Sequence, residues 1–180
     1  MNTKQTLLLV ITMLAGTFLA SADQEAGNGL YVRSAQYGAY YAKCIPSERY
    51  GTNGQTQIFI ATRTNDMLQT TFDWYSSNLY LQGTAWGISV VRFGPWQRGS
   101  SASTNDLAIA FYMNKKLLKS YSTLDIAGST TNVSQSISHY RVFSKIPGYR
   151  WIKSNDYAFD VTRSDGRQLS FDVRTGEIIQ

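Results

Sequence analysis

The stretch YAFDVTRSDGRQLSFDVRTGEIIQ, residues 157–180, decides the fold class. Apolar residues occupy every second position in each of its two halves, first Tyr157, Phe159 and Val161, then Leu169, Phe171 and Val173. An alternation of period two is typical of β-strands that bury one face. The two halves are therefore predicted to be neighbouring antiparallel strands.

The length of the loop between these strands fixes their register, and the loop contains Ser164-Asp165-Gly166. A two-residue Asp-Gly loop would pair Val161 with Ser170 and place an apolar side chain against a polar one. A three-residue loop pairs Val161 with Leu169 and gives Gly166 the positive φ of a bulged turn. The three-residue loop is therefore predicted.

A second three-residue loop, residues 174–176, is predicted to bring Ile179 opposite Phe171 and so to complete a three-stranded meander. Upstream, short apolar segments alternate with clusters of turn-forming residues, a pattern typical of all-β chains. Residues 133–143 fit either a short helix or a strand, and we favour a strand because Tyr140, Val142 and Phe143 prefer β structure. The other predicted strands are residues 30–33, 40–45, 57–62, 68–74, 78–82, 86–93, 107–113 and 117–123.

A degenerate repeat is visible in three loops, residues 64–66, 114–116 and 174–176, each of which follows an apolar-rich strand. A strand pair followed by a hairpin in each unit resembles a β-propeller blade. Three units are too few to close a propeller, although a second subunit could complete one. We therefore expect antiparallel meanders in a two-sheet sandwich or a curved open sheet, ahead of propeller-blade-like repeats.

The N-terminus predicts export. Lys4 precedes an apolar run over residues 7–19, and small residues at 20–22 suit a signal peptidase. The run is shorter than the roughly 20 residues that a membrane span needs. We therefore expect a signal peptide at 1–22, a flexible lead-in at 23–29 and a single all-β domain at 30–180, with no transmembrane segment in the mature chain. The protein would be periplasmic or secreted.

Charge and cysteine content narrow the function classes. The chain has a formal net charge of +5, with its Lys and Arg residues scattered and densest at Lys115, Lys116 and Lys119. Because nucleic-acid binders cluster such residues on one face, no nucleic-acid partner is predicted. Cys44 is the only cysteine, so an intramolecular disulfide is impossible.

Candidate catalytic groups are few. An exported hydrolase could use Cys44 as a nucleophile with His139, the only histidine, as its base. Cys44 alternates with Tyr40 and Ala42 on a predicted strand, which indicates a buried thiol instead. No Gly-x-Ser-x-Gly elbow occurs, so a triad with His139 would have to assemble in space. With a single histidine and no phosphate-binding or calcium-binding loop, neither a metal nor a cofactor is expected.

Aromatic residues are enriched, with 12 Tyr, 8 Phe and 4 Trp. Most of them, Trp86 and Trp151 included, are predicted to anchor the core. Trp96 instead lies in a turn after Pro95, where a core position is less expected.

With Phe93, Arg92 and Arg98, Trp96 could form an exposed aromatic and basic rim suited to stacking on a sugar or on a partner's side chain. Phe93, Trp96 and Arg98 are therefore the predicted binding residues. The sequence favours an exported noncatalytic β domain that binds an envelope or extracellular protein, or a glycan, and it leaves the oligomeric state open.

Overall fold

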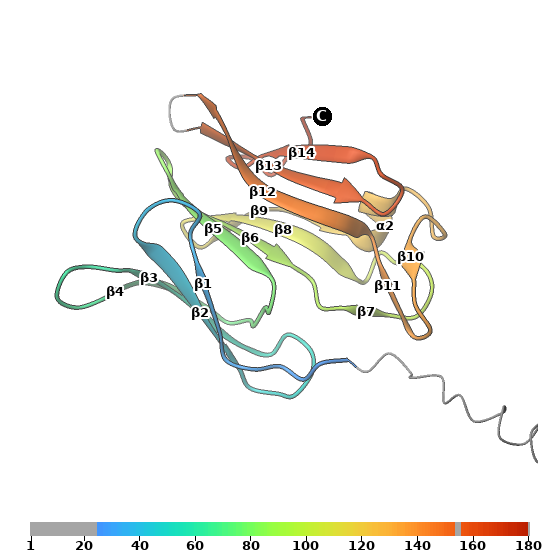
Figure 1. The fold of residues 1–180 in the computed structure, drawn as a ribbon, viewed down its shortest axis with the longest axis horizontal. Coiled ribbons are helices and arrows are strands. Elements are labelled where there is room, and N and C mark those ends of the chain that lie inside the picture. The colour runs from blue at the N-terminus through green and yellow to red at the C-terminus, as the bar shows by residue number, and fades with distance from the viewer. Residues whose placement is uncertain (1–24, 154–155, 180) are drawn as a thin grey trace, which may run out of the picture.

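A computed structural model describes residues 25–153 and 156–179 of this chain, so the predicted signal peptide lies outside the described residues. The described part consists mainly of β-strands with one short helix, α2 (Thr123–Ala127) (Figure 1). The strands are β1 (Tyr31–Ser34), β2 (Tyr40–Pro46), β3 (Gly54–Ile60), β4 (Met67–Phe72), β5 (Leu79–Thr84), β6 (Gly87–Phe93), β7 (Gln97–Arg98), β8 (Leu107–Met113), β9 (Lys116–Ser122), β10 (Ser134–Gln135), β11 (His139–Arg141), β12 (Phe143–Lys153), β13 (Asp156–Arg163) and β14 (Gln168–Asp172).

The strands form four antiparallel sheets. Sheet A has the order β1-β2-β3-β4, sheet B β5-β6-β8-β9, sheet C β10-β11-β7 and sheet D β12-β13-β14. The predicted all-β class with antiparallel meanders is confirmed. The blade-like repeat stays a prediction.

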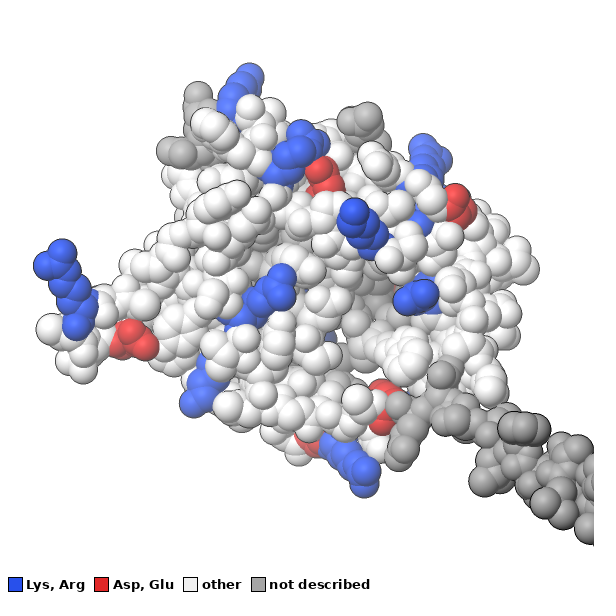
Figure 2. All heavy atoms as spheres, viewed as in Figure 1, with Lys and Arg blue, Asp and Glu red and all other residues white. Residues whose placement is uncertain are grey.

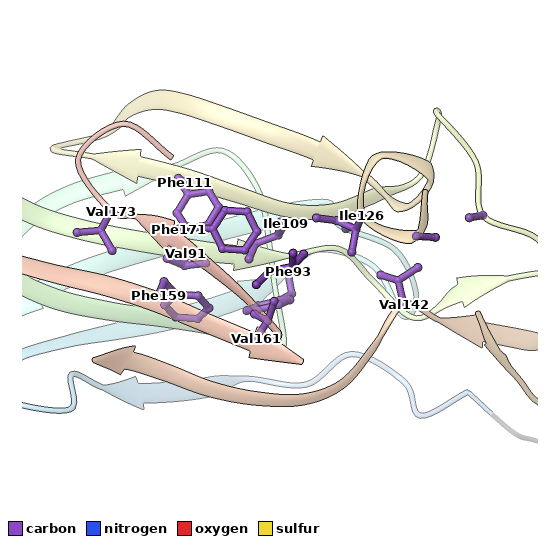
Figure 3. Close-up of a cluster of buried hydrophobic side chains, with 14 of the residues drawn as sticks. Val91, Phe93, Ile109, Phe111, Ile126, Val142, Phe159, Val161, Phe171 and Val173 are labelled. Carbon is purple, nitrogen blue, oxygen red and sulfur yellow. The ribbon is translucent and has the colours of Figure 1, made fainter. Parts of the chain in front are cut away.

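Sheet B lies between two other sheets. Successive side chains of its strands point to opposite faces, and each face packs against a different core cluster. Val90 and Leu81 pack into one core cluster with Cys44 and Ile58 of sheet A. Val91, Phe93, Ile109 and Phe111 instead face a larger cluster that includes Phe159, Val161 and Phe171 of sheet D (Figure 3). The order of layers is therefore sheet A, sheet B and sheet D (Figure 1).

The C-terminal hairpin has the predicted register. Val161 pairs with Leu169, Phe159 pairs with Phe171, and Gly166 has a φ of +88°. The alternation of apolar and polar positions therefore predicted the loop length correctly.

The second C-terminal turn is one residue longer than predicted. Phe171 bridges to Ile178 rather than to Ile179. The N–H of Asp172 donates to the carbonyl of Glu177, and the N–H of Gly176 donates back to the carbonyl of Asp172 at 2.7 Å. These bonds close a four-residue loop, with Gly176 at a φ of +75°.

The prediction that Trp86 and Trp151 anchor the core is wrong. Trp86 lies in the two-residue turn between β5 and β6 and is 58% exposed, and Trp151, near the end of β12, is 64% exposed. The predicted strands 78–82 and 86–93 left residues 83–85 as the turn, but Gly83 belongs to β5, where a Cβ would lie 2.8 Å from the ring of Tyr40. The missing side chain of Gly83 lets Tyr40 of sheet A pack closely against β5, and the chain reverses further on, at residues 85–86.

The ambiguous segment 133–143 contains β10 and β11 and the first residue of β12, so the preference for strand over helix is confirmed. The short helix α2 lies just upstream and was not predicted. Ser122 caps it, accepting a hydrogen bond from the N–H of Asp125, whose carboxylate accepts one from the N–H of Ser122. None of the helices within residues 25–153 and 156–179 is long and apolar enough to cross a membrane.

Candidate functional site

The candidate site is built around the turn that links β6 to β7. Phe93 ends β6 inside the core, and the chain then turns outward through Gly94 and Pro95 to reach Trp96. The turn is held against β8, because the N–H of Gly94 donates to the carbonyl of Ala108 at 3.2 Å and the side chain of Gln97 donates to the carbonyl of Leu107 at 2.7 Å. Trp96 therefore projects from a fixed base while its side chain stays 43% exposed.

Trp96 lines four adjoining hollows, where sheets A, B and C meet. The largest has a volume of about 710 Å³, and its walls include Tyr50, Arg92, Arg98 and Asn105. Figure 2 shows a hollow on this face, between the strands of sheet A and the part of the molecule that carries β7 and β11. The Lys and Arg side chains are spread over the same face rather than gathered in one patch (Figure 2).

His139 lies beneath Trp96. The pairing of β7 with β11 places His139 opposite Arg98, and the imidazole stacks on the indole with ring centroids 4.4 Å apart and an interplanar angle of 26°. His139 is only 5% exposed. Its Nδ1 is 2.8 Å from the hydroxyl of Ser138, whereas Nε2 is buried and has no hydrogen-bond partner among the described residues.

Tyr140 fixes the position of β11. Its hydroxyl donates to the carboxylate of Asp106 at 2.6 Å and lies 2.9 Å from the hydroxyl of Thr123. Burial, followed by the bond to Asp106, raises the pKa of Tyr140 to about 12, so the phenol stays a donor at neutral pH. This buried network joins β11 to α2 and to the loop before β8, and so keeps His139 in place.

The segment predicted to be a flexible lead-in contacts the site. Asn28 is held by the loop after β2: its N–H donates to the carbonyl of Arg49 at 2.7 Å, and its side chain donates to the carbonyls of Glu48 and Gly51. Glu25 reaches Arg98, and its Oε2 accepts hydrogen bonds from Nη2 at 2.7 Å and Nε at 3.2 Å. The same oxygen lies 3.9 Å from Nε2 of His139.

The two residues of the hypothetical thiol site are in different places. Cys44 is fully buried between sheets A and B, whereas His139 lies in sheet C. Loss of hydration on burial raises the pKa of the Cys44 thiol to about 11. A buried, protonated thiol is a poor nucleophile.

We expect Cys44 to resist thiol reagents in the folded protein. At pH 8, a pKa of about 11 leaves about one thiol in a thousand ionised, and reagents cannot reach it without local opening. Reaction with 5,5′-dithiobis(2-nitrobenzoate) should therefore be at least about a hundredfold slower in buffer than in 8 M urea. Equal rates in the two solvents would contradict the buried assignment.

Of the predicted binding residues, Trp96 and Arg98 both line the largest hollow, but Phe93 is a core residue. The expected exposed rim is therefore wrong for Phe93, whose ring packs on Phe143 and Phe159. Arg92 is half-buried, with its guanidinium 4.5 Å from the ring of Trp74.

Sequence reasoning missed Glu25 and Tyr50 as members of the site. Both belong to segments of polar and turn-forming residues, which carry no periodic signal. Within residues 25–153 and 156–179, no group of three His, Cys, Asp or Glu side chains is arranged to hold a metal ion. Comparisons with protein-family models, curated proteins and solved structures found no match for this chain.

Proposed function

We propose that this chain is an exported noncatalytic domain that acts in the cell envelope or outside the cell and binds a glycan. The glycan would bind in the largest of the hollows around Trp96, here named the Trp96 cleft, whose walls include Tyr50, Arg92, Arg98 and Asn105. The observation that carries the proposal is the half-exposed indole of Trp96 on a rigid turn, at the meeting point of four hollows. Large exposed aromatic side chains are expensive to leave in water and supply flat faces for stacking.

The polar groups around the indole support a sugar as the ligand. Arg98 and Asn105 offer hydrogen-bond donors on the wall of the largest hollow, and Tyr50 supplies a second aromatic surface there. A ligand site that combines aromatic faces with a few fixed polar groups can orient a ring that bears many hydroxyls. The predicted signal peptide supports an extracellular or periplasmic ligand.

Replacing Trp96 with alanine is expected to weaken glycan binding at least tenfold, which corresponds to about 1.4 kcal/mol, because it removes the stacking surface. The purified protein would be screened on a glycan array and the selected glycan measured by calorimetry. Trp86→Ala is the matched control, since Trp86 is similarly exposed but lies in the turn between β5 and β6.

Binding that survives in Trp96→Ala, or that falls equally in Trp86→Ala, would contradict the assignment of the site. An array with no bound glycan, together with a protein partner whose capture needs Trp96, would instead assign the cleft to a protein ligand. Both variants should keep the melting temperature of the parent, which separates loss of binding from loss of fold.

An exported hydrolase is the second candidate, and one contact favours it. Ser138, His139 and Glu25 form a row, with 2.8 Å from the serine hydroxyl to Nδ1 and 3.9 Å from Nε2 to the carboxylate. Two features weigh against it, because the indole covers the imidazole and Arg98 already engages the carboxylate. Turnover of p-nitrophenyl acetate that disappears in Ser138→Ala would favour the hydrolase.

A further inference from the structure

Resting on the proposed function, we propose that the Trp96 cleft selects acidic sugars, and that Glu25 holds the place of the ligand's carboxylate in the free protein. The ligand would present its carboxylate to Arg98 and His139 and its ring to Trp96. The Glu25 carboxylate would leave Arg98 when the ligand binds.

In the contact between Glu25 and Arg98, this guanidinium already binds a carboxylate. Two nitrogen atoms of Arg98, Nη2 and Nε, approach one oxygen of Glu25 at 2.7 and 3.2 Å. Arginine suits this task because its donors are planar and fixed relative to one another. The Arg98 side chain is 70% exposed, so a ligand from solvent can reach it.

His139 gives a second and independent indication of a ligand. Its Nε2 is buried, points toward the carboxylate of Glu25 at 3.9 Å, and has no hydrogen-bond partner among the described residues. In the tautomer in which the Ser138 hydroxyl donates to Nδ1, Nε2 carries the ring proton, and a buried N–H without an acceptor costs free energy. A free carboxylate, which has no chain tethering it, could approach both Arg98 and His139.

The segment that carries Glu25 is anchored at Asn28. Asn28 is anchored to the loop after β2 by three hydrogen bonds and is flanked by Gly27 and Gly29. Ahead of this anchor, Ala26 is exposed, and Glu25 is held through an ion pair with an exposed arginine. The Arg98 side chain is open to solvent although that of Glu25 is only 17% exposed, so a ligand that also stacks on Trp96 would compete with Glu25 for Arg98.

The imidazole of His139 can report binding of the ligand by NMR. His139 is the only histidine, so a tag-free protein has a single imidazole Cε1–H signal in its NMR spectrum. The signal would be followed at constant pH while D-glucuronate, D-glucose or inorganic phosphate is added. Saturable shifts are expected with D-glucuronate, whereas D-glucose and phosphate at the same concentrations should leave the signal in place.

Glu25→Gln should bind D-glucuronate about tenfold more tightly than the parent protein, because the tethered competitor is weakened. Glu48→Gln is the matched control. It removes a charge from the wall of the same hollow, but Glu48 contacts Asn53 rather than Arg98, so the affinity should stay within about twofold of the parent. Arg98→Gln should abolish the shift.

Three results would overturn the inference. One is the absence of a saturable shift with D-glucuronate in Glu25→Gln, and another is an equal shift with D-glucose or phosphate. The third is an equal gain of affinity in Glu25→Gln and Glu48→Gln, which would indicate general charge relief. If the glycan array finds a neutral glycan whose binding needs Trp96, the proposed function stands while this inference fails; if no glycan depends on Trp96, both fail.

Discussion

Replacing Phe159 with alanine is expected to lower the free energy of unfolding by about 3–5 kcal/mol, the range measured for Phe→Ala substitutions in cores. Phe159 is fully buried in β13, and its ring lies 5.1 Å from that of Tyr149, 5.4 Å from that of Tyr80 and 6.0 Å from that of Phe93. It therefore joins sheet D to sheet B. Urea unfolding followed by tryptophan fluorescence would measure the loss, and the melting temperature should fall by about 10 °C or more.

Trp151→Ala is the control for this substitution. Trp151 pairs with Tyr157 across the same two strands but is largely exposed, so its loss should change stability by less than about 0.5 kcal/mol. Similar losses for Phe159→Ala and Trp151→Ala would mean that sheet D does not pack on sheet B as described.

Replacing Gly94 with alanine is expected to cost about 3 kcal/mol of stability, at the upper end for overpacked sites, and to disturb the site as well. A Cβ at Gly94 would lie 1.9 Å from the carbonyl oxygen of Leu107, so the backbone of the turn or of β8 must shift. Trp96 follows two residues later, so any shift is transmitted to the indole. We expect both lower stability in urea and at least tenfold weaker binding of the glycan selected on the array.

Gly29→Ala is the comparison for Gly94→Ala, because a Cβ at Gly29 would meet no atom within 4 Å. It should leave stability and binding near the values of the parent. A Gly94→Ala protein with unchanged stability would show that the close approach of the turn to β8 is not a constraint on the fold.

The sequence predicted the parts of the fold that depend on local alternation. The pairing of Phe159 with Phe171 follows from matching apolar faces, and the burial of Cys44 follows from its phase in β2. One error arose where a glycine could lie either within a strand or in a turn. Gly83 provides room for Tyr40 within β5, and Trp86 was consequently assigned to a strand instead of a turn.

Only part of the candidate site could be predicted from the sequence. Trp96 and Arg98 were found because an aromatic and a basic residue in a turn are poorly explained by the core. The stack on His139 depends on the pairing of β7 with β11, two very short strands about 40 residues apart in the sequence. The contact with Glu25 spans 73 positions and involves a polar segment without periodicity, so only the tertiary structure brings it to Arg98.

The most direct test of the central claim is to observe the four tryptophan indole N–H signals of the ¹⁵N-labelled protein while the glycan selected on the array is added. Single Trp→Phe variants would assign the signals. Binding in the cleft predicts a saturable shift of the Trp96 signal, with the exposed Trp86 and Trp151 unaffected. A shift of Trp86 or Trp151 while the Trp96 signal stays unchanged would contradict the account and move the binding surface away from the cleft.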